Sequence, residues 1–197
     1  MLTLPDGIKA IIFDLDGTLV AFPGDDLLPH VKETIAHLKA TYPALKYGVA
    51  SNQGGVGLRA WMKADGFGQP ERYPTEQAAR QRVERVLAQL GLVASVAMSF
   101  AYCSQKGKWA PTPLSERGKQ EWSKEFRKPA PGMLTWLMEL YEIDDPQTVL
   151  MGGDWSEDST AAVNAGCQFM WASEFFTSDR TDEEVLKDLR DFDLGEE

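Results

Sequence analysis

Apolar and polar residues follow two different periods along the chain. Short apolar runs predict strands over residues 8–15, 47–50, 93–100, 148–151 and 168–171, and the first of them is β-branched and almost unbroken in its apolarity, as in a buried strand. Apolar residues at helical spacing predict helices over 28–40, 75–90, 131–141 and 156–165. The second of these helices ends before Gly91, a typical helix stop. Strands that alternate with helices are typical of a parallel sheet with helices on both faces.

The predicted fold class is therefore α/β, a doubly wound (Rossmann-like) parallel sheet. In such sheets, ligands bind at the carboxyl ends of the strands, where the loops converge. Three polar clusters fall at these ends: Asp14 with Asp16, Ser51 with Asn52, and Asp154 with Asp158. We expect the fold to bring these clusters together, although they are distant in sequence.

Two segments fall outside this alternation. Residues 102–127 are rich in Lys, Gly, Pro and Ser without a clear period, which predicts a long loop or insertion. The three glycines Gly54, Gly55 and Gly57 follow the second strand, and we expect them to let the backbone turn tightly near an anion.

The length of 197 residues favours one domain, predicted over residues 1–172, followed by an acidic tail or helix over 173–197. The net charge is −10, and the segment from Glu174 onward carries −7 of it. The acidity is thus concentrated at one end, and it does not exclude an anionic substrate elsewhere.

The remaining composition indicates a soluble cytoplasmic protein. Cys103 and Cys167 are the only cysteines, too few for a disulfide framework. No apolar run reaches the roughly 18 residues of a membrane span. The first residues lack the basic and apolar regions of a signal peptide.

The pair Asp14 and Asp16 carries the first chemical signal. Side chains two residues apart on an extended segment point the same way, so both carboxylates can face one site. Two close carboxylates that leave water require a compensating cation. Carboxylate oxygens suit Mg²⁺, which also binds phosphate oxygens. The alternative interpretation of Asp-Leu-Asp-Gly alone is a strand followed by a turn.

Four ordered motifs together resemble the haloacid dehalogenase (HAD)-like phosphatases. They are DLDGT at 14–18, SNQGG at 51–55, RKPAPGM at 127–133 and GGDWSEDSTAAVNAG at 152–166. The second and third motifs are similar to those of the branch that contains histidinol-phosphate phosphatases, heptose-bisphosphate phosphatases and polynucleotide 3′-phosphatases. The resemblance implies a HAD-like fold, and the short 19–46 segment leaves no room for a large cap domain there.

The resemblance also implies roles for individual residues. Asp14 would be the nucleophile that forms an aspartyl-phosphate, and Asp16 the general acid and base, which requires a pKa above the roughly 3.9 of a free aspartate. Ser51 and Lys128 would bind the phosphate and assist catalysis, with Thr18 and Asn52 as supports. The Mg²⁺ ligands would be Asp14, Asp16 (through its backbone carbonyl), Asp154 and Asp158, the last as an outer ligand or orienting group.

These observations predict a Mg²⁺-dependent phosphomonoesterase. The alternatives are a phosphotransferase of the same fold and a non-catalytic HAD-like binding module. The substrate is a small phosphorylated metabolite or the 3′-phosphate of a polynucleotide. Relatives that act on sugar bisphosphates commonly carry a zinc loop, but here Cys103 stands without nearby histidines, so that activity is in doubt.

The substrate question turns on residues 102–128. They carry a net charge of +4 with interleaved tryptophans and Phe126, a mixture that can track a nucleic-acid backbone and stack bases. An ordinary solvated loop is the alternative. The sequence leaves the natural substrate and the oligomeric state open.

Overall fold

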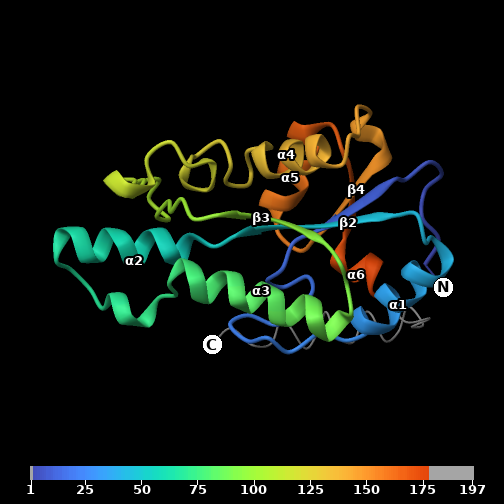
Figure 1. The fold of residues 1–197 in the computed structure, drawn as a ribbon, viewed down its shortest axis with the longest axis horizontal. Helices are drawn as coiled ribbons and strands as arrows, with labels where there is room; N and C mark the ends of the chain where they lie inside the picture. The colour runs from blue at the N-terminus through green and yellow to red at the C-terminus, as the bar shows by residue number, and fades with distance from the viewer. Residues whose placement is uncertain (1, 178–197) are drawn as a thin grey trace.

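A five-stranded parallel sheet forms the centre of the molecule (Figure 1). The computed structural model describes residues 2–177. The strands are β1 (Ala10–Phe13), β2 (Lys46–Asn52), β3 (Ser95–Ser99), β4 (Val149–Gly153) and β5 (Gln168–Trp171). Their order across the sheet is β3-β2-β1-β4-β5, and every pair is parallel. This arrangement confirms the predicted α/β doubly wound fold.

Helices cover both faces of the sheet (Figure 1). One face carries α1 (Val31–Thr41), α3 (Glu76–Leu90) and α6 (Ala172–Phe175), and the other carries α4 (Gly132–Leu140) and α5 (Ser156–Ala165). β1 shows why: Ile11 and Phe13 pack with the first group, whereas Ala10 and Ile12 pack with the second. Successive side chains of a strand point to opposite faces, so a fully apolar strand supplies two cores.

The strand order reverses at β1, which pairs with β2 on one side and β4 on the other. The crossover connections leave in opposite directions from this point, and a crevice forms at the carboxyl ends of the strands. The backbone N–H of Asp14 donates to the carbonyl of Gly152 on β4 at 2.9 Å. This hydrogen bond holds the chain that leaves β1 against β4. The three polar clusters lie at this same edge of the sheet, at the carboxyl ends of the strands.

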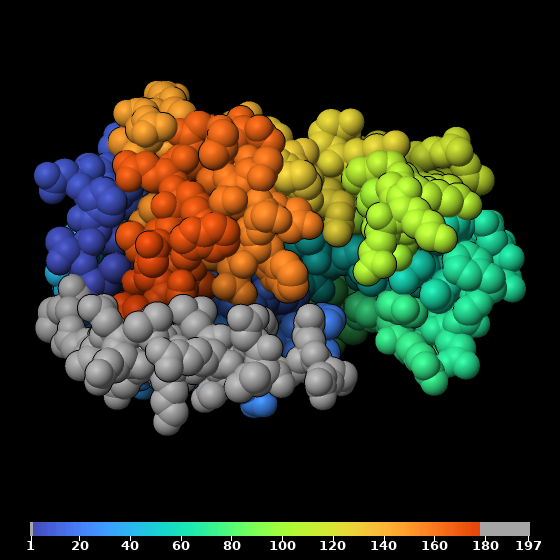
Figure 2. Space-filling view, turned by 180° about the vertical axis from the view of Figure 1, so that it is seen from behind, coloured from blue at the N-terminus to red at the C-terminus, as the bar shows by residue number. Residues whose placement is uncertain are grey.

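A lobe projects from this end of the sheet (Figures 1 and 2). We define it as α2 (Gly54–Asp65), the short 3₁₀ helix η1 (Pro70–Arg72) and residues 102–127, which contain η2 (Leu114–Glu116) and η3 (Gln120–Trp122). In Figure 2 the 102–127 segment lies on α2 at one end of the molecule. The expectation of a long loop at 102–127 is confirmed, and Trp122 and Phe126 anchor it in the core.

The interpretation of Gly54, Gly55 and Gly57 as a tight loop is wrong. These residues form the first turn of α2, a helix absent from the sequence prediction. A Cβ at residue 57 would lie only 2.2 Å from the carbonyl oxygen of Phe100. Gly57 is therefore required because the helix runs against the 100–102 backbone, and α2 can then project beside the loop.

The end of the chain is described only as far as Thr177. Within the predicted tail, Phe175 and Phe176 pack against Phe13 of β1, with ring centroids 5.1 and 5.8 Å away. The rest of the predicted acidic tail, 178–197, lies outside the described residues.

None of the helices between residues 2 and 177 is long and apolar enough to cross a membrane. One further 3₁₀ turn, η4 (Pro146–Thr148), leads into β4.

Candidate active site

A buried lysine joins two carboxylates at the carboxyl ends of β1 and β4. The Lys128 ammonium contacts Asp14 Oδ1 and Asp158 Oδ1, each at 2.6 Å. Asp14 follows β1, Asp158 lies in the first turn of α5, and Lys128 lies four residues before α4. Lys128 is only 2% exposed and Asp14 only 4%. Three motifs thus meet in one charged cluster, although Asp14 lies 114 residues from Lys128, and Lys128 lies 30 residues from Asp158.

The cluster holds two carboxylates and one ammonium, and the pKa values reflect that imbalance. Burial raises the pKa of Asp14 to about 6; the Lys128 charge opposes this shift and the Asp158 charge adds to it. Burial works against the charge of Lys128, but Asp14 and Asp158 outweigh it and raise the lysine's pKa above its ordinary value. Lys128 therefore stays protonated, and the cluster has room for a further positive charge.

Asp158 is fully engaged in orienting its surroundings. Its Oδ1 accepts from Lys128, and its Oδ2 accepts from the backbone N–H groups of Asp154 and Trp155 at 3.1 and 3.0 Å. The structure therefore places Asp158 where it positions Lys128 and the 154–155 loop. Because both of its oxygens are occupied, it fits the orienting half of the expectation better than the role of a metal ligand.

Ser51 and Asn52 end β2 beside this cluster. Ser51 is buried, and its Oγ accepts from Gln53 Nε2 at 2.9 Å, so its O–H proton remains free to donate. Asn52 forms a reciprocal pair with Lys128: its Nδ2 donates to the lysine carbonyl, and its Oδ1 accepts from the lysine N–H, both at 3.0 Å. Asn52 thus fixes the backbone that carries Lys128.

Asp16 is held from two sides. Its Oδ1 pairs with the Arg82 guanidinium of α3 at 2.6 Å, and its Oδ2 accepts from Gln53 Nε2 at 3.1 Å. The Asp16 carboxylate therefore lies against a guanidinium of α3 on one side and a neutral amide on the other. The carbonyl of Asp16 accepts from the indole N–H of Trp155 at 3.3 Å.

A cavity of about 170 Å³ opens onto these groups. Its lining residues are Asp14, Asp16, Ser51, Asn52, Arg127, Lys128, Trp155, Glu157 and Asp158. Trp155 is 59% exposed. The nucleophile, acid–base and phosphate-binding candidates therefore face one space. Thr18 differs from them: it is fully buried, its Oγ1 has no hydrogen-bond partner among the described residues, and it does not line the cavity.

Whether this site fits a divalent cation depends on its oxygen donors. Among residues 2–177, no three acidic, His or Cys side chains form a metal cluster by themselves. The carboxylates of Asp14 and Asp154 and the carbonyl of Asp16 nevertheless supply hard oxygen donors, which suit Mg²⁺. A Cβ at Gly17 would lie 3.2 Å from Asp154 Oδ2 and 3.3 Å from Trp155 Nε1, so the glycine keeps this space open. Partial burial raises the pKa of Asp154, and the negative charge of the nearby Asp158 raises this pKa further. This donor set fits the ion.

Five residues around the site are absent from the sequence prediction, among them Glu157, which lines the cavity next to Asp158. Gln53 stood inside the SNQGG motif, one residue beyond Asn52, and could have been selected. Trp155 and Arg127 likewise adjoin predicted residues. Arg82 carried no signal, because it lies on the polar side of an ordinary amphipathic helix. Only the packing of α3 beneath the 14–18 loop brings it to Asp16.

Comparison with known proteins supports the interpretation of the fold. The chain matches, over residues 125–191, a family model described as "HAD-hyrolase-like". A protein from Mesorhizobium loti, proposed to be a HAD-like phosphatase, is 22% identical with a TM-score of 0.56; the match covers 85% of this chain and 73% of that one. The chain has the HAD-like hydrolase fold.

A second solved structure is less similar. A 4-nitrophenylphosphatase from Thermotoga maritima is 18% identical with a TM-score of 0.43, over 92% of this chain and 91% of that one. A search of curated proteins finds no match. The HAD-like fold and the partial family match support a hydrolase, and the expected branch with histidinol-phosphate phosphatases and polynucleotide 3′-phosphatases stays a prediction.

Proposed function

We propose that this HAD-like protein is a Mg²⁺-dependent phosphomonoesterase that acts through an aspartyl-phosphate on Asp14. The observation that carries the proposal is the buried Asp14–Lys128–Asp158 cluster, which opens onto the same cavity as Ser51 and Asp16. A buried carboxylate beside a fixed ammonium is a suitable arrangement for attack on an anionic phosphoryl group, because the ammonium offsets the repulsion between the two.

The residues divide the reaction between them. Lys128 and the Ser51 hydroxyl hold the phosphoryl oxygens while Asp14 forms the new bond to phosphorus and the ester P–O bond breaks. Asp16 gives its proton to the departing oxygen, then takes a proton from the water that attacks phosphorus; phosphate leaves and Asp14 is restored. Asp14, Asp154 and the Asp16 carbonyl would hold Mg²⁺, which would supply further neutralisation of phosphate charge.

The substrate could be small or polymeric, and the lobe bears on that choice. Residues 102–127 carry six bases against three acids in a chain of net charge −10. Lys108 lies over the Trp61 ring at 4.7 Å, and Lys124 over the Trp109 ring at 5.1 Å. Cations and aromatic rings on one projecting surface favour a nucleic-acid 3′ end as the second candidate substrate beside a small phosphate ester.

The test is hydrolysis of p-nitrophenyl phosphate, with and without Mg²⁺, by the wild type and Asp14→Asn. We expect Mg²⁺-dependent turnover that Asp14→Asn abolishes. Mass spectrometry of rapidly denatured enzyme should find a phosphoryl group on the peptide that contains Asp14. Wild-type activity that persists in Asp14→Asn would falsify the assignment of the nucleophile. If an added alcohol captured most of the phosphoryl group, the phosphotransferase alternative would be favoured instead.

A further inference from the structure

Arg82 occupies an unusual position for a residue of α3, since its guanidinium contacts the loop formed by residues 14–18. It contacts Asp16 Oδ1 at 2.6 Å and Asp25 Oδ1 at 2.9 Å, and it also donates to the carbonyl of Gly24. Its side chain is only 14% exposed. The Arg82 guanidinium therefore links Asp16, the acid–base candidate, to the turn formed by residues 24–25.

The same segment is fastened to α3 at further points. Arg85 contacts Asp25 Oδ2 at 2.8 Å, and Gln89 donates to the carbonyl of Asp25 at 3.1 Å. Arg85 is 58% exposed and pairs with Asp25 rather than with Asp16, although it lies one helical turn from Arg82. Asp25 thus has two arginine partners, but Arg82 is the one that also holds Asp16.

The hold on Asp16 is asymmetric. Gln53 shares its amide between Asp16 Oδ2 at 3.1 Å and Ser51 Oγ at 2.9 Å, whereas Arg82 makes a shorter ion pair with Oδ1 at 2.6 Å. The Arg82 contact is an ion pair without hydrogen-bond geometry, and it keeps Oδ1 turned toward α3. Oδ2 accepts only from the neutral amide of Gln53, so we assign the proton transfer to this oxygen. The rotation of the carboxylate is thereby set by Arg82 more than by Gln53.

We propose that Arg82 is a positioning residue that orients Asp16 for proton transfer to the leaving group and couples it to the 24–25 turn. This inference rests on the proposed phosphatase function. The reaction step concerned is the one in which the ester P–O bond breaks while the Asp16 proton moves to the departing oxygen. Arg82 acts through Asp16 and does not touch the phosphoryl group.

Leaving groups of different basicity give a specific test. A nitrophenolate departs readily without protonation, whereas an alkoxide needs a proton from a well-placed acid. A purely structural role for Arg82 would affect both esters alike. A positioning role would affect the alkyl ester selectively, because misplacement of a catalytic group by about 1 Å can cost up to about 100-fold.

The experiment measures kcat and KM of Arg82→Gln, Arg82→Lys and the control Arg85→Gln on p-nitrophenyl phosphate and on an alkyl phosphate such as glycerol 2-phosphate. For Arg82→Gln we expect kcat on the alkyl ester to fall about 10- to 100-fold, with KM changed less than threefold and kcat on the aryl ester changed only a few-fold. Arg82→Lys, which restores a cation but not the fork, should recover part of the loss. Arg85→Gln should resemble the wild type on both esters.

A double variant shows whether the effect passes through Asp16. In the Asp16→Asn background, Arg82→Gln should cause no further loss on the alkyl ester, since the acid is already absent. Equal losses on both esters, a change confined to KM, or full additivity with Asp16→Asn would overturn the inference. If Arg82→Gln does not fold, Asp25→Asn replaces it, because it frees Arg82 from the turn, and it should show the same selectivity at smaller size. Wild-type enzyme inactive on both esters would instead refute the phosphatase function itself.

Discussion

At the scale of single residues, the chemistry of the site rests on how Asp14 is compensated. Its carboxylate shares one ammonium with Asp158, so two negative charges face one positive charge out of water. The negative charge that Lys128 leaves uncompensated is available to a further cation. The stability that is lost at Asp14 is the counterpart of its reactivity.

The raised pKa of Asp14, about 6, predicts how stability depends on pH. Between the ordinary pKa of an aspartate and about 6, the folded state binds more protons at Asp14 than the unfolded state. The contribution of Asp14 to the free energy of unfolding is therefore complete at low pH. It falls by up to about 3 kcal/mol as the pH rises to about 6. Without divalent metal, Asp14→Asn should therefore unfold at a higher temperature than the wild type at pH 7.5.

The measurement is thermal unfolding in a chelator at pH 7.5 and pH 4, with the exposed Asp6→Asn as control. The advantage of Asp14→Asn should shrink toward pH 4, while Asp6→Asn follows the wild type throughout. Added Mg²⁺ should raise the unfolding temperature of the wild type and leave Asp14→Asn unchanged. Equal pH profiles for the wild type and Asp14→Asn would show that Asp14 is fully compensated without metal.

Removal of the Lys128 ammonium should lower the stability of the protein, whereas removal of the Asp14 charge should raise it. Lys128→Met keeps much of the side-chain volume but leaves Asp14 and Asp158 without the ammonium between them. Removal of one partner from a buried ion pair costs about 3–5 kcal/mol, so urea unfolding should detect a loss of that size together with loss of phosphatase activity. The control is Lys119→Met, whose lysine is 54% exposed. If both variants were equally stable, Lys128 would not compensate the two carboxylates.

At the scale of elements, prediction from sequence succeeded where packing and periodicity agree. The helix over 156–165 and the strand over 168–171 have the predicted bounds, and Gly166, in the left-handed conformation, ends the helix between them. The polar clusters at the strand ends also meet as expected, because parallel topology alone brings strand ends together. Local pattern and global fold agree in these parts of the chain.

The prediction failed at α2 and at Arg82 for a different reason. Three glycines at the start of α2 suggest a loop, although Gly57 is needed for the helix to approach the 100–102 backbone, a contact between segments far apart in sequence. The Arg82–Asp16 pair likewise depends on where α3 packs rather than on any local spacing. Long-range contacts of this kind leave no period in the sequence.

Gly57 tests this explanation. In an isolated helix Gly57→Ala would be stabilising by about 1 kcal/mol, but the new methyl group would meet the Phe100 carbonyl oxygen at 2.2 Å. We expect a net loss of about 1–3 kcal/mol in chemical unfolding. Gly24→Ala is the matched control, since its nearest contact would be an ordinary 3.7 Å. A stabilised Gly57→Ala protein would mean that α2 does not lie against residues 100–102.

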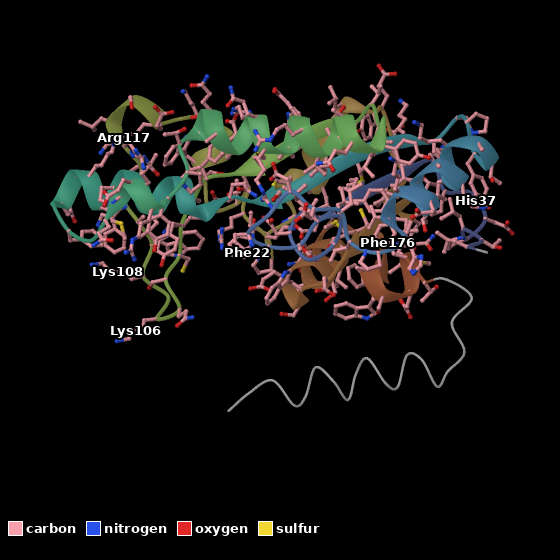
Figure 3. The ribbon with its side chains drawn as sticks, turned by 90° about the horizontal axis from the view of Figure 1, so that it is seen from below. Phe22, His37, Lys106, Lys108, Arg117 and Phe176 are labelled. Atoms are coloured by element: carbon pink, nitrogen blue, oxygen red, sulfur yellow. The ribbon has the colours of Figure 1, made fainter. Side chains whose placement is uncertain are left out.

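At the scale of the whole molecule, charge is segregated. Residues 102–127 carry net +3 in a chain of net −10, and the labelled Lys106, Lys108 and Arg117 all lie at the end of the molecule where α2 projects (Figure 3). The site itself lies at the base of the lobe, because α2 begins directly after Ser51, Asn52 and Gln53. A polyanion bound at its terminal phosphate could therefore extend over a positive surface on an otherwise acidic protein.

The salt dependence of kcat/KM separates the two substrate classes. If the lobe contacts a nucleic-acid backbone, kcat/KM for a 3′-phosphorylated oligonucleotide should fall steeply with NaCl, with a log–log slope of about −0.7 for each phosphate contacted. A small phosphate ester should respond only weakly, since it reaches the buried cluster alone. The double variant Lys106→Glu, Arg117→Glu replaces two exposed cations and should flatten the slope for the oligonucleotide without change for the small ester. Equal salt responses for both substrates would indicate that the lobe contributes no backbone contact, and the small ester would then be the better description of the natural substrate.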